Sequence, residues 1–488
     1  MSKEDRKTGI SFLWNGSKVT GQPGDSVAAA LWRAGVTTLT RSRKLHRPLG
    51  YSGSYLTGVL ARVDGRPNVR LDQIVVRHGM VVEMQNTWPS ARFDVLRLAQ
   101  LLPSKAVYGG FEHGDWMPKS GLAYRLAERV MANLAGVGRP AEISLQPQAI
   151  PGKRIAIDSL VIGGGPAGIS EANRRAAKGE KVALVTRGES IARLATTMGG
   201  GVEALHPGVT LFSGMELFGI YREGALMVGA PHDHKRSAVV FEARETILAT
   251  GRRSIPPLVR GNQLPGVMDV HTALQLAAVF KTMPGKQVAV VGTGAEIAVA
   301  HRLRELGVNV VHIGHVQQLQ EICGRTRVNA IQASTRIACD TLIHAGPWRV
   351  DPSLGFQASG EGVFQVEARP LPGRISVVGS AALGNECISV NPNLDPETLI
   401  CPCMDVTAGE LYCHIDKGET DPEVLKRLTS CGMGTCQGFP CWEHMLAMLA
   451  ARVGGGLESF ARPTHRPPRR SITIAQAAGL AGLVEPDK

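Results

Sequence analysis

The sequence predicts an α/β chain of several domains: a small β-grasp-like domain, two Rossmann-like nucleotide-binding domains, and a small helical domain rich in cysteine. Three observations predict it. The chain has 488 residues, too many for one hydrophobic core. A strand–GxG–helix–strand pattern occurs twice, which is typical of parallel-sheet nucleotide domains. Six of the nine cysteines lie between residues 401 and 441, and the first 322 residues contain none.

Composition narrows the class of protein. Hydrophobic residues make up 43% and charged residues 20% of the chain, as in ordinary globular proteins. No apolar run is long enough to cross a bilayer, and the first ten residues, MSKEDRKTGI, lack the apolar core of a secretory signal. We therefore expect a cytoplasmic protein without a membrane span. In that compartment clustered cysteines more often bind metal or perform redox chemistry than form disulfides.

The charge is uneven. The net charge is +12, and residues 1–110 hold 16 Lys and Arg against 7 Asp and Glu, a surplus of 9. No helix-turn-helix, zinc-finger or stacked-aromatic signature accompanies this surplus, so we expect no nucleic-acid partner. A solvated face, or a surface that meets phosphate groups or an acidic partner subunit, explains it instead.

The N-terminal domain is predicted from hairpin and capping signals. Residues 10–21 read as two strands around Asn15–Gly16, a strong hairpin signal. Residues 25–35 read as a short helix with Asp25 or Ser26 as N-cap and Gly35 after its end. Further strands are expected within 58–65 and 72–84.

The rest of the chain alternates strands and helices until about residue 385. The expected units are a β-grasp-like domain (1–105), a helical linker (106–154), a first nucleotide domain (155–260 and 346–390), a nested second one (261–345), a cysteine domain (391–460) and a basic, Pro-rich tail (461–488). We expect the tail to run extended along the surface or to be disordered.

The first glycine loop, GGGPAG, stands between a strand and a helix. Gly163 permits the tight turn, Gly165 lets the backbone approach a pyrophosphate, and Gly168 lets the helix pack on the strand. Pro166 and Ala167 complete the phosphate-facing loop, which predicts nucleotide binding.

The strand after this loop departs from a conventional FAD site. An acid usually follows that strand and holds the ribose hydroxyls, but Thr186 and Arg187 stand there. Arg187 suits an extra phosphate. The alternative is a surface arginine, with the ribose held by other groups.

The second loop, residues 292–297, keeps Gly292 and Gly294 but has Ile297 at the third glycine position. Its second strand also ends without an acid. A scaffold kept for its packing is the favoured interpretation, and ligand binding the alternative.

The clustered cysteines indicate a metal centre. Cys401 and Cys403 form CxC, and Cys436 and Cys441 form CxxxxC. We call these four the ligand cysteines. They lie beside expected helix starts, where free N–H groups and partial positive charge suit an anionic iron–sulfur cluster. Zinc would use much the same thiolates, and spacing alone leaves it open.

The remaining thiols are expected to be non-ligands. Cys413 should be a core residue in mid-helix, and Cys431 ends a helix close to Cys436. Cys323, Cys339 and Cys387 are expected to be isolated and buried.

Three helices are expected among these cysteines. Thr407 and Glu410 form a capping box, and Asp421 caps a second helix that Gly432 should close. A third helix should begin near Phe439. Gly432, Gly434 and Gly438 are expected to let the backbone approach the cluster closely.

Several motifs resemble known oxidoreductase subunits. The segment CPCMDVT…TSCGMGTCQGFPC resembles the bacterioferritin-associated-ferredoxin-type [2Fe–2S] domain found in α subunits of hydrogen cyanide synthase, opine oxidase and hydroxyproline dehydrogenase. LATGRRSIPP…LPGVMDVHTALQL is similar to the same subunits and contains Thr250 and Gly251, expected cofactor contacts. RSRKLHRPLGYSG and VEMQNTWPSARFDV resemble the α subunit of heterotetrameric sarcosine oxidase.

The resemblance implies glutathione/thioredoxin reductase-like nucleotide domains, a ferredoxin-like N-terminal domain and a [2Fe–2S] cluster on the ligand cysteines. It also implies an electron-transfer subunit, working with an FAD-containing β subunit that oxidises a secondary amine or amino acid of the sarcosine, proline, hydroxyproline or opine type. FMN at the interface with a partner, and a small γ subunit, are further implied features.

The chain departs from the resemblance in three ways. It lacks the folate-binding half of the sarcosine oxidase subunit, its N-terminal domain has no cysteines, and Ser380 replaces the usual Asp of a GD pair. Arg187 and Ser380 thus stand at two positions where a residue that contacts FAD is usual. We therefore expect either FAD or another adenine nucleotide. Two alternatives stay open: a self-contained NAD(P)H-dependent FAD/[2Fe–2S] reductase, and a non-catalytic scaffold that holds the cluster.

The basic loop Arg41–Arg47 supplies the last candidate residues. Arg43, Lys44 and Arg47 are expected to bind a cofactor phosphate or the acidic surface of a partner subunit, because guanidinium groups bind phosphate bidentately. A solvated face is the alternative.

Overall fold

The computed structural model describes residues 9–53, 59–109, 120–134, 149–221, 226–359, 371–388, 390–434, 436–465, 467–470 and 472–483. The chain folds into two compact units. Unit 1 comprises Met1–Ile143, Ser254–Pro347 and Ile388–Phe460. Unit 2 comprises Ser144–Arg253, Trp348–Cys387 and Ala461–Lys488. Within the described ranges, no helix combines the length and apolarity that crossing a membrane requires.

The N-terminal domain of unit 1 is a five-stranded sheet with one helix, as predicted. Its strand order is β2-β1-β7-β5-β6, and β1 and β7 are parallel. The strands are β1 Ile10–Trp14, β2 Ser17–Gly21, β5 Leu60–Val63, β6 Arg66–Arg70 and β7 Val81–Met84. Helix α1 (Val27–Arg33) begins at Ser26, whose side chain accepts a hydrogen bond from the Ala29 N–H. The range 72–84 was expected to be one strand, but only its last four residues are, after a turn.

A second, two-stranded hairpin belongs to this domain. Strands β3 (Thr40–Arg41) and β4 (Pro48–Leu49) are antiparallel, so the basic loop is the end of a hairpin. Two 3-10 helices, η1 (Val95–Leu101) and η2 (Ser104–Val107), and helix α2 (Gly121–Leu134) follow.

The second nucleotide domain also belongs to unit 1. Its parallel sheet has the order β15-β21-β16-β17, next to an antiparallel sheet β18-β19-β20. The elements are β15 Val267–Asp269, α5 Val270–Leu274 continuing as a π-turn Gln275–Val279, β16 Val288–Gly292, α6 Glu296–Glu305, β17 Val310–His315, η5 Val316–Gln318, β18 Glu321–Gly324, β19 Val328–Gln332, β20 Arg336–Ala338 and β21 Thr341–Ala345. The predicted strand–loop–helix–strand pattern is therefore confirmed.

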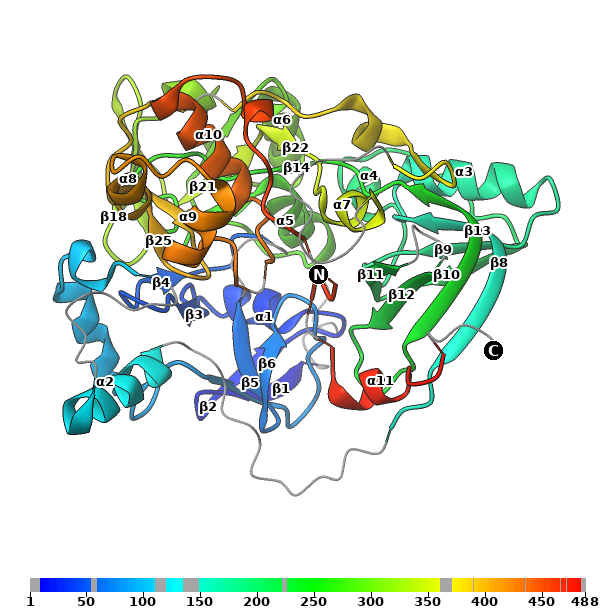
Figure 1. Ribbon diagram of the computed structural model, residues 1–488, viewed down its shortest axis with the longest axis horizontal. Coiled ribbons are helices and arrows are strands. Elements are labelled where there is room, and N and C mark those ends of the chain that lie inside the picture. Colours follow the sequence, from blue (N-terminus) through cyan, green and yellow to red (C-terminus); the bar gives the residue numbers. More distant parts are fainter. Residues whose placement is uncertain are drawn as a thin grey trace. The chain divides into compact units, whose positions relative to one another are not determined.

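The cysteine domain completes unit 1. A short hairpin, β24 (Leu399–Cys401) and β25 (Val406–Thr407), is followed by three helices around a common core, drawn in orange to red in Figure 1. They are α8 Ala408–Ile415, α9 Pro422–Thr429 and α10 Cys441–Val453, with η7 Leu457–Ser459 after them. Gly432 was expected to close α9, but Ser430 does so, in the left-handed conformation at φ 63°.

Unit 2 is the first nucleotide domain. One sheet runs β10-β9-β8-β13-β12-β11, and β23 pairs with β13. Its elements are β8 Lys153–Ile162, α3 Pro166–Ala176, β9 Val182–Val185, α4 Arg193–Thr197, β10 Val209–Phe212, β11 Met215–Tyr221, β12 Leu226–Pro231, β13 Val239–Leu248, α7 Ser353–Ser359, β23 Ile375–Val377, η6 Gly379–Leu383 and α11 Ile474–Ala478. Two short strands, β14 (Arg253–Ser254) and β22 (Trp348–Arg349), lie where the chain passes between the units.

The C-terminal tail differs from its prediction. Arg469 donates its backbone N–H to Phe218 of β11, and the Arg470 guanidinium donates to the carbonyl of Ala230. Leu480 is buried in an apolar cluster with Phe218 and Leu226. The described part of the tail is thus packed into unit 2.

Candidate metal centre and nucleotide site

The structure brings the four ligand cysteines together. The Sγ atoms of Cys401 and Cys403 are 3.7 Å apart, those of Cys403 and Cys436 3.3 Å, and those of Cys436 and Cys441 3.9 Å. Three of these side chains are buried, and that of Cys436 is half-buried. Cys401 is the last residue of β24 and Cys403 lies in the turn after it, while Cys436 precedes α10 and Cys441 is the first residue of α10.

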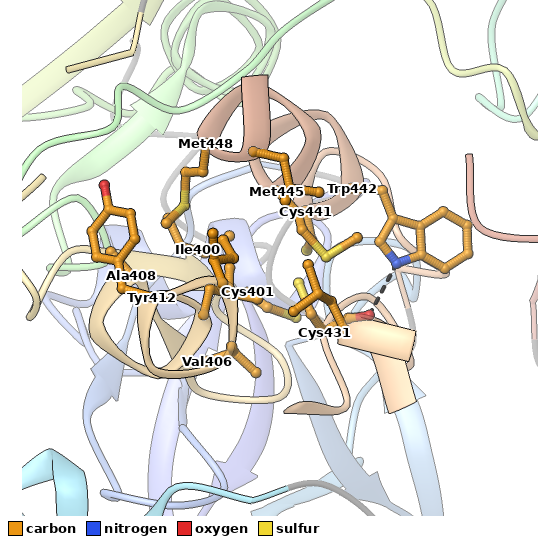
Figure 2. Close-up of a cluster of buried hydrophobic side chains, with 14 of the residues drawn as sticks. Ile400, Cys401, Val406, Ala408, Tyr412, Cys431, Cys441, Trp442, Met445 and Met448 are labelled. Carbon is orange, nitrogen blue, oxygen red and sulfur yellow. Dashed lines mark hydrogen bonds between the residues drawn. The ribbon is translucent and has the colours of Figure 1, made fainter. Parts of the chain in front are cut away.

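Glycines and a tryptophan shape the turn opposite. A Cβ atom on Gly434 would lie 2.4 Å from the Cys403 Sγ, so only glycine fits there. Gly432 and Gly438 instead face the Trp442 indole, where added Cβ atoms would lie 2.0 and 2.4 Å from ring atoms. The predicted close approach of the backbone to the ligand cysteines is therefore seen at Gly434, and at Gly432 through its N–H, but not at Gly438. Figure 2 shows the indole N–H of Trp442 donating to the Cys431 carbonyl, at 2.9 Å.

Hydrogen bonding and charge shift the pKa values of the thiols in opposite directions. Hydrogen bonds from Cys401, Cys436 and Cys441 hold the pKa of Cys403 well below its usual range, and the Arg43 guanidinium acts in the same direction. Hydrogen bonds to Cys401 and Cys403 raise the pKa of Cys441, and burial adds to this. Thiols that share a buried negative charge in this way are suited to a cation or a cationic cluster core.

The donor set fits an iron–sulfur cluster. Four thiols supply the usual ligands, and the Gly432 N–H donates to the Cys401 Sγ at 3.3 Å, as amides do to cluster sulfurs. The thiols lie in contact with one another rather than around a central space. Accordingly, no three His, Cys, Asp or Glu side chains in the described ranges stand ready as ligands of a single metal ion. A bound group would have to separate the two turns.

The other cysteines partly contradict expectation. Cys431 is fully buried beside Cys401, whose hydrogen bond raises its pKa. Figure 2 shows the side chains of Cys401, Cys431 and Cys441 converging next to α10. Cys413 was expected in the core and Cys387 to be buried, but both are exposed. Cys339 is buried, and Cys323 is half-buried.

The first glycine loop has the geometry of a phosphate cradle. Gly163 has φ 121° and lies against the Ala249 carbonyl, and a Cβ on Gly168 would meet the Gly163 carbonyl oxygen at 1.9 Å. In contrast, a Cβ on Gly165 would meet nothing within 4 Å. Open space therefore lies in front of the N-terminus of α3, where Pro166 occupies the first turn.

Other predicted contacts border the same end of α3. Gly379 lies against Ala167, since an added Cβ would be 2.5 Å from the Ala167 Cβ. Gly251, which follows Thr250, has φ 70° and lies near the Ser380 Oγ. Ser380 itself lies in the 3-10 turn η6.

Arg187 lies near a carboxylate. Its charge acts together with those of Arg470, Arg469 and His232 on Glu216, a largely buried side chain on β11. Burial opposes ionisation of Glu216, but these cations outweigh it and lower its pKa to about 2. Arg187 thus lies in a cation-rich cluster, which the spacing of the sequence did not reveal.

The second glycine loop carries its own anion. The Glu296 carboxylate accepts a hydrogen bond from the Gly294 N–H at 2.6 Å, and a Cβ on Gly292 would lie 2.6 Å from it. The backbone amide that would face a pyrophosphate is therefore taken by an internal carboxylate. Ile297 is exposed beside it.

The basic loop contacts the cysteine domain. Lys44 pairs with Glu410 at 2.5 Å, and Arg47 pairs with Asp405 at 3.2 Å. Arg43 donates to the Met404 Sδ at 3.3 Å. Sequence reasoning missed Asp405, although an acid two residues after a ligand cysteine is a signal that could have suggested it.

Two protein families match parts of the chain. Residues 7–87 match the family described as a 2Fe-2S iron-sulfur cluster binding domain, although this segment contains no cysteine. Residues 157–336 match the family described as pyridine nucleotide-disulphide oxidoreductase.

The curated relatives are oxidase subunits. The alpha subunit of sarcosine oxidase from Rhizobium meliloti (strain 1021) is 26% identical over 97% of this chain and 58% of its own length. An opine oxidase subunit from the same organism is 34% identical over 18% of this chain and 19% of its own length. The chain is thus a homologue of the sarcosine oxidase α subunit, and spans little more than half of it.

A solved structure has the same fold. L-proline dehydrogenase from P. horikoshii superposes with a TM-score of 0.71 at 21% identity, covering 97% of this chain and 98% of that one. The predicted fold class is confirmed.

Proposed function

We propose that this homologue of the sarcosine oxidase α subunit is the electron-transfer subunit of a hetero-oligomeric, flavin-dependent dehydrogenase or oxidase of a secondary amine or amino acid. The observation that carries the proposal is the gathering of four thiols, three of them buried, at two adjacent segments of the chain. The names of the relatives, which are subunits of sarcosine and opine oxidases, support the substrate class.

The ligand cysteines would hold a [2Fe–2S] cluster. When bound, such a cluster carries electrons one at a time between donor and acceptor. The chain's own residues give it a dry, rigid setting: Gly434 leaves room beside Cys403, and Trp442 closes the turn that contains Cys431.

The first glycine loop would hold FAD or another adenine nucleotide. Gly165 leaves the space that phosphates need, and the first turn of α3 presents free N–H groups to it. Ser380 and Arg187 stand where acids are usual, so the ribose of this nucleotide would be held by other groups. Amine oxidation would take place on an FAD-containing β subunit, and the further components would be FMN at an interface and a small γ subunit.

A self-contained NAD(P)H-dependent reductase fits the second loop poorly. Glu296 presents a carboxylate where the pyrophosphate of a pyridine nucleotide would bind, and two anions repel each other there. The second loop is therefore proposed as scaffold.

Cysteine variants test the metal centre. The chain is purified together with its partners, and iron, sulfide and visible absorption are measured. Cys436→Ser should abolish the absorption, whereas Cys431→Ser should leave it. Cys413→Ser, which changes an exposed thiol, is the matched control. Loss of the cluster from Cys431→Ser, or zinc in place of iron, would contradict the assignment.

Reduction experiments test the activity. Under anaerobic conditions, sarcosine, proline, hydroxyproline or an opine should bleach the flavin absorption of the complex, and NAD(P)H should not. Bleaching of the chain alone by NAD(P)H would favour the reductase. A chain that carries a cluster but no nucleotide would be the non-catalytic scaffold.

A further inference from the structure

Two hairpin ends meet inside unit 1. The basic loop (Arg41–Arg47) joins β3 to β4, and the residues Cys401–Asp405, which we call the cysteine turn, join β24 to β25. The first belongs to the cysteine-free N-terminal domain, and the second carries two ligand cysteines.

Asp405 anchors the two hairpins to each other. Its side chain is fully buried, and it accepts hydrogen bonds from the Ser42 hydroxyl at 2.5 Å and from the Leu45 N–H at 2.6 Å. Arg47 adds an ion pair at 3.2 Å. Asp405 also has φ 55°, a conformation that a non-glycine residue keeps only where its surroundings hold it.

Two further ion pairs flank this anchor. Lys44 pairs with Glu410 on α8, a carboxylate that also accepts the Gly109 N–H at 2.9 Å. Arg47 reaches Glu397 at 3.0 Å on the other side. Carboxylates that precede and follow the cysteine turn in the sequence are therefore both paired with cations of the basic loop.

Arg43 is left with a different role. Among the described residues no carboxylate lies within ion-pair distance of it, and its guanidinium contacts the Met404 Sδ, at 3.3 Å. Met404 stands between Asp405 and Cys403, so the guanidinium contacts the residue next to a ligand cysteine instead of an acid. Glu410 and Asp405 neutralise Lys44 and Arg47, whereas the charge of Arg43 is not neutralised in this way.

We propose that the basic loop is a clamp on the metal centre: Asp405 fixes the cysteine turn, and Arg43 is a positioning residue whose charge favours the reduced state of a bound cluster. This inference rests on the proposed function. It gives the N-terminal domain, which has no cysteine of its own, a task at the cysteines of another domain.

The sign of the effect follows from charge. A [2Fe–2S] cluster with four thiolates is an anion, and reduction adds one more negative charge. A nearby cation stabilises the more negative state and so raises the reduction potential. Burial of the thiols limits solvent screening of this interaction.

Redox titration of the full-length chain, followed by electron paramagnetic resonance of the reduced cluster, tests the charge. Arg43→Gln should lower the reduced-to-oxidised ratio at a fixed potential by roughly threefold to tenfold, tenfold being about 59 mV for one electron. Arg43→Lys should restore most of it. Arg77→Gln, which removes an exposed guanidinium from the same domain, is the control.

The outcomes separate the two proposals. A wild-type chain without iron and sulfide overturns the proposed metal centre. An intact cluster whose potential is the same in Arg43→Gln as in Arg77→Gln overturns the clamp alone. Loss of iron from Arg43→Gln but not from Arg43→Lys supports a requirement for charge, and loss from both overturns it.

A second variant tests the anchor. Asp405→Asn keeps the side-chain shape but removes the charge, and should speed iron release to a chelator by about tenfold. Lys44→Gln loses only the flanking ion pair with Glu410, so its rate of iron release should lie between those of the wild type and Asp405→Asn. Release at the wild-type rate from Asp405→Asn would overturn the anchoring role.

Discussion

Gly165 and Gly168 belong to one loop motif, yet the structure gives them different tasks. A Cβ on Gly168 would collide with the Gly163 carbonyl oxygen at 1.9 Å, so this glycine is required by packing. A Cβ on Gly165 would meet nothing within 4 Å. The packing of the folded chain therefore does not require a glycine at position 165, a difference that the sequence motif alone could not reveal.

This difference predicts separable effects. Gly165→Ala should change the free energy of unfolding by less than about 0.5 kcal/mol, because the new methyl group meets no atom. It should weaken nucleotide binding roughly tenfold or more, by intruding on the phosphates. Chromatography of the nucleotide that remains bound after gentle purification checks the binding, and urea denaturation checks the free energy of unfolding. Gly168→Ala should damage the fold itself, and nucleotide retained unaltered by Gly165→Ala would make the loop structural only.

The burial of His344 on β21 should make the stability of the folded chain depend on pH. Its imidazole is almost fully buried, its Nδ1 lies 2.6 Å from the Ser254 hydroxyl, and burial lowers its pKa to about 4 despite the opposing charge of Asp269. Between pH 6.5 and about 4 the unfolded chain binds a proton here and the folded chain does not. Stability must therefore fall as the pH falls through this window.

The predicted size of this effect is about 3 kcal/mol across the window. Urea denaturation at several pH values should show it in the wild type. His344→Gln, which cannot titrate, should lower stability at pH 7 but flatten the dependence between pH 6.5 and 4. An equal slope in both proteins would mean that the folded chain takes up a proton at His344 as readily as the unfolded chain does.

Helix α9 shows, at the scale of elements, what capping signals can and cannot fix. Asp421 caps its start as predicted, accepting the Glu423 N–H at 2.7 Å. Its end was assigned to Gly432, since glycine is the usual left-handed residue. Ser430 adopts that conformation instead, and Gly432 is used two residues later against Trp442. The local sequence identified Gly432 as a suitable capping residue, but the tertiary structure packs this glycine against Trp442.

Replacing the capping residue should stabilise the helix end. Ser430→Gly relieves a left-handed conformation at a residue with a Cβ, against the larger entropy of a glycine in the unfolded chain. The expected gain is about 0.5–1 kcal/mol in the free energy of unfolding, measured with urea. Ser430→Ala, which keeps the Cβ, should show no gain. If both variants are equally stable, the strain at Ser430 is negligible.

The capping box of α8 was only half predictable. The Thr407 hydroxyl accepts the Glu410 N–H at 3.3 Å, as the motif predicts. The Glu410 carboxylate binds Lys44 and the Gly109 N–H instead of completing the box. A partner more than three hundred residues away in sequence decides its role, and no local rule contains that information.

For the whole molecule, periodicity and glycine loops were sufficient to predict the order of the domains, because strands and helices are local features. They could not show that three separate stretches of chain form unit 1 and three others form unit 2. The surplus charge of residues 1–110 illustrates the limit. Lys44 and Arg47 meet carboxylates of the cysteine domain, so a surplus counted along the sequence is partly neutralised in space.

The tail carries the last prediction. Its basic, Pro-rich composition favoured an extended or disordered segment, but single residues rather than composition decide its packing. Leu480 is 6% exposed among Phe218, Leu226 and Val228, whereas Ile474 on α11 is 76% exposed. Leu480→Ala should therefore cost unit 2 about 2–5 kcal/mol, and Ile474→Ala almost nothing.

Limited proteolysis distinguishes these variants. In Leu480→Ala, cleavage should appear first within unit 2, because the apolar cluster that the tail completes is opened, while the cysteine domain of unit 1 keeps its iron. Ile474→Ala should digest like the wild type. If Leu480→Ala is as resistant as Ile474→Ala, the tail only rests on the sheet; if iron is lost together with unit 2, the two units depend on each other for folding.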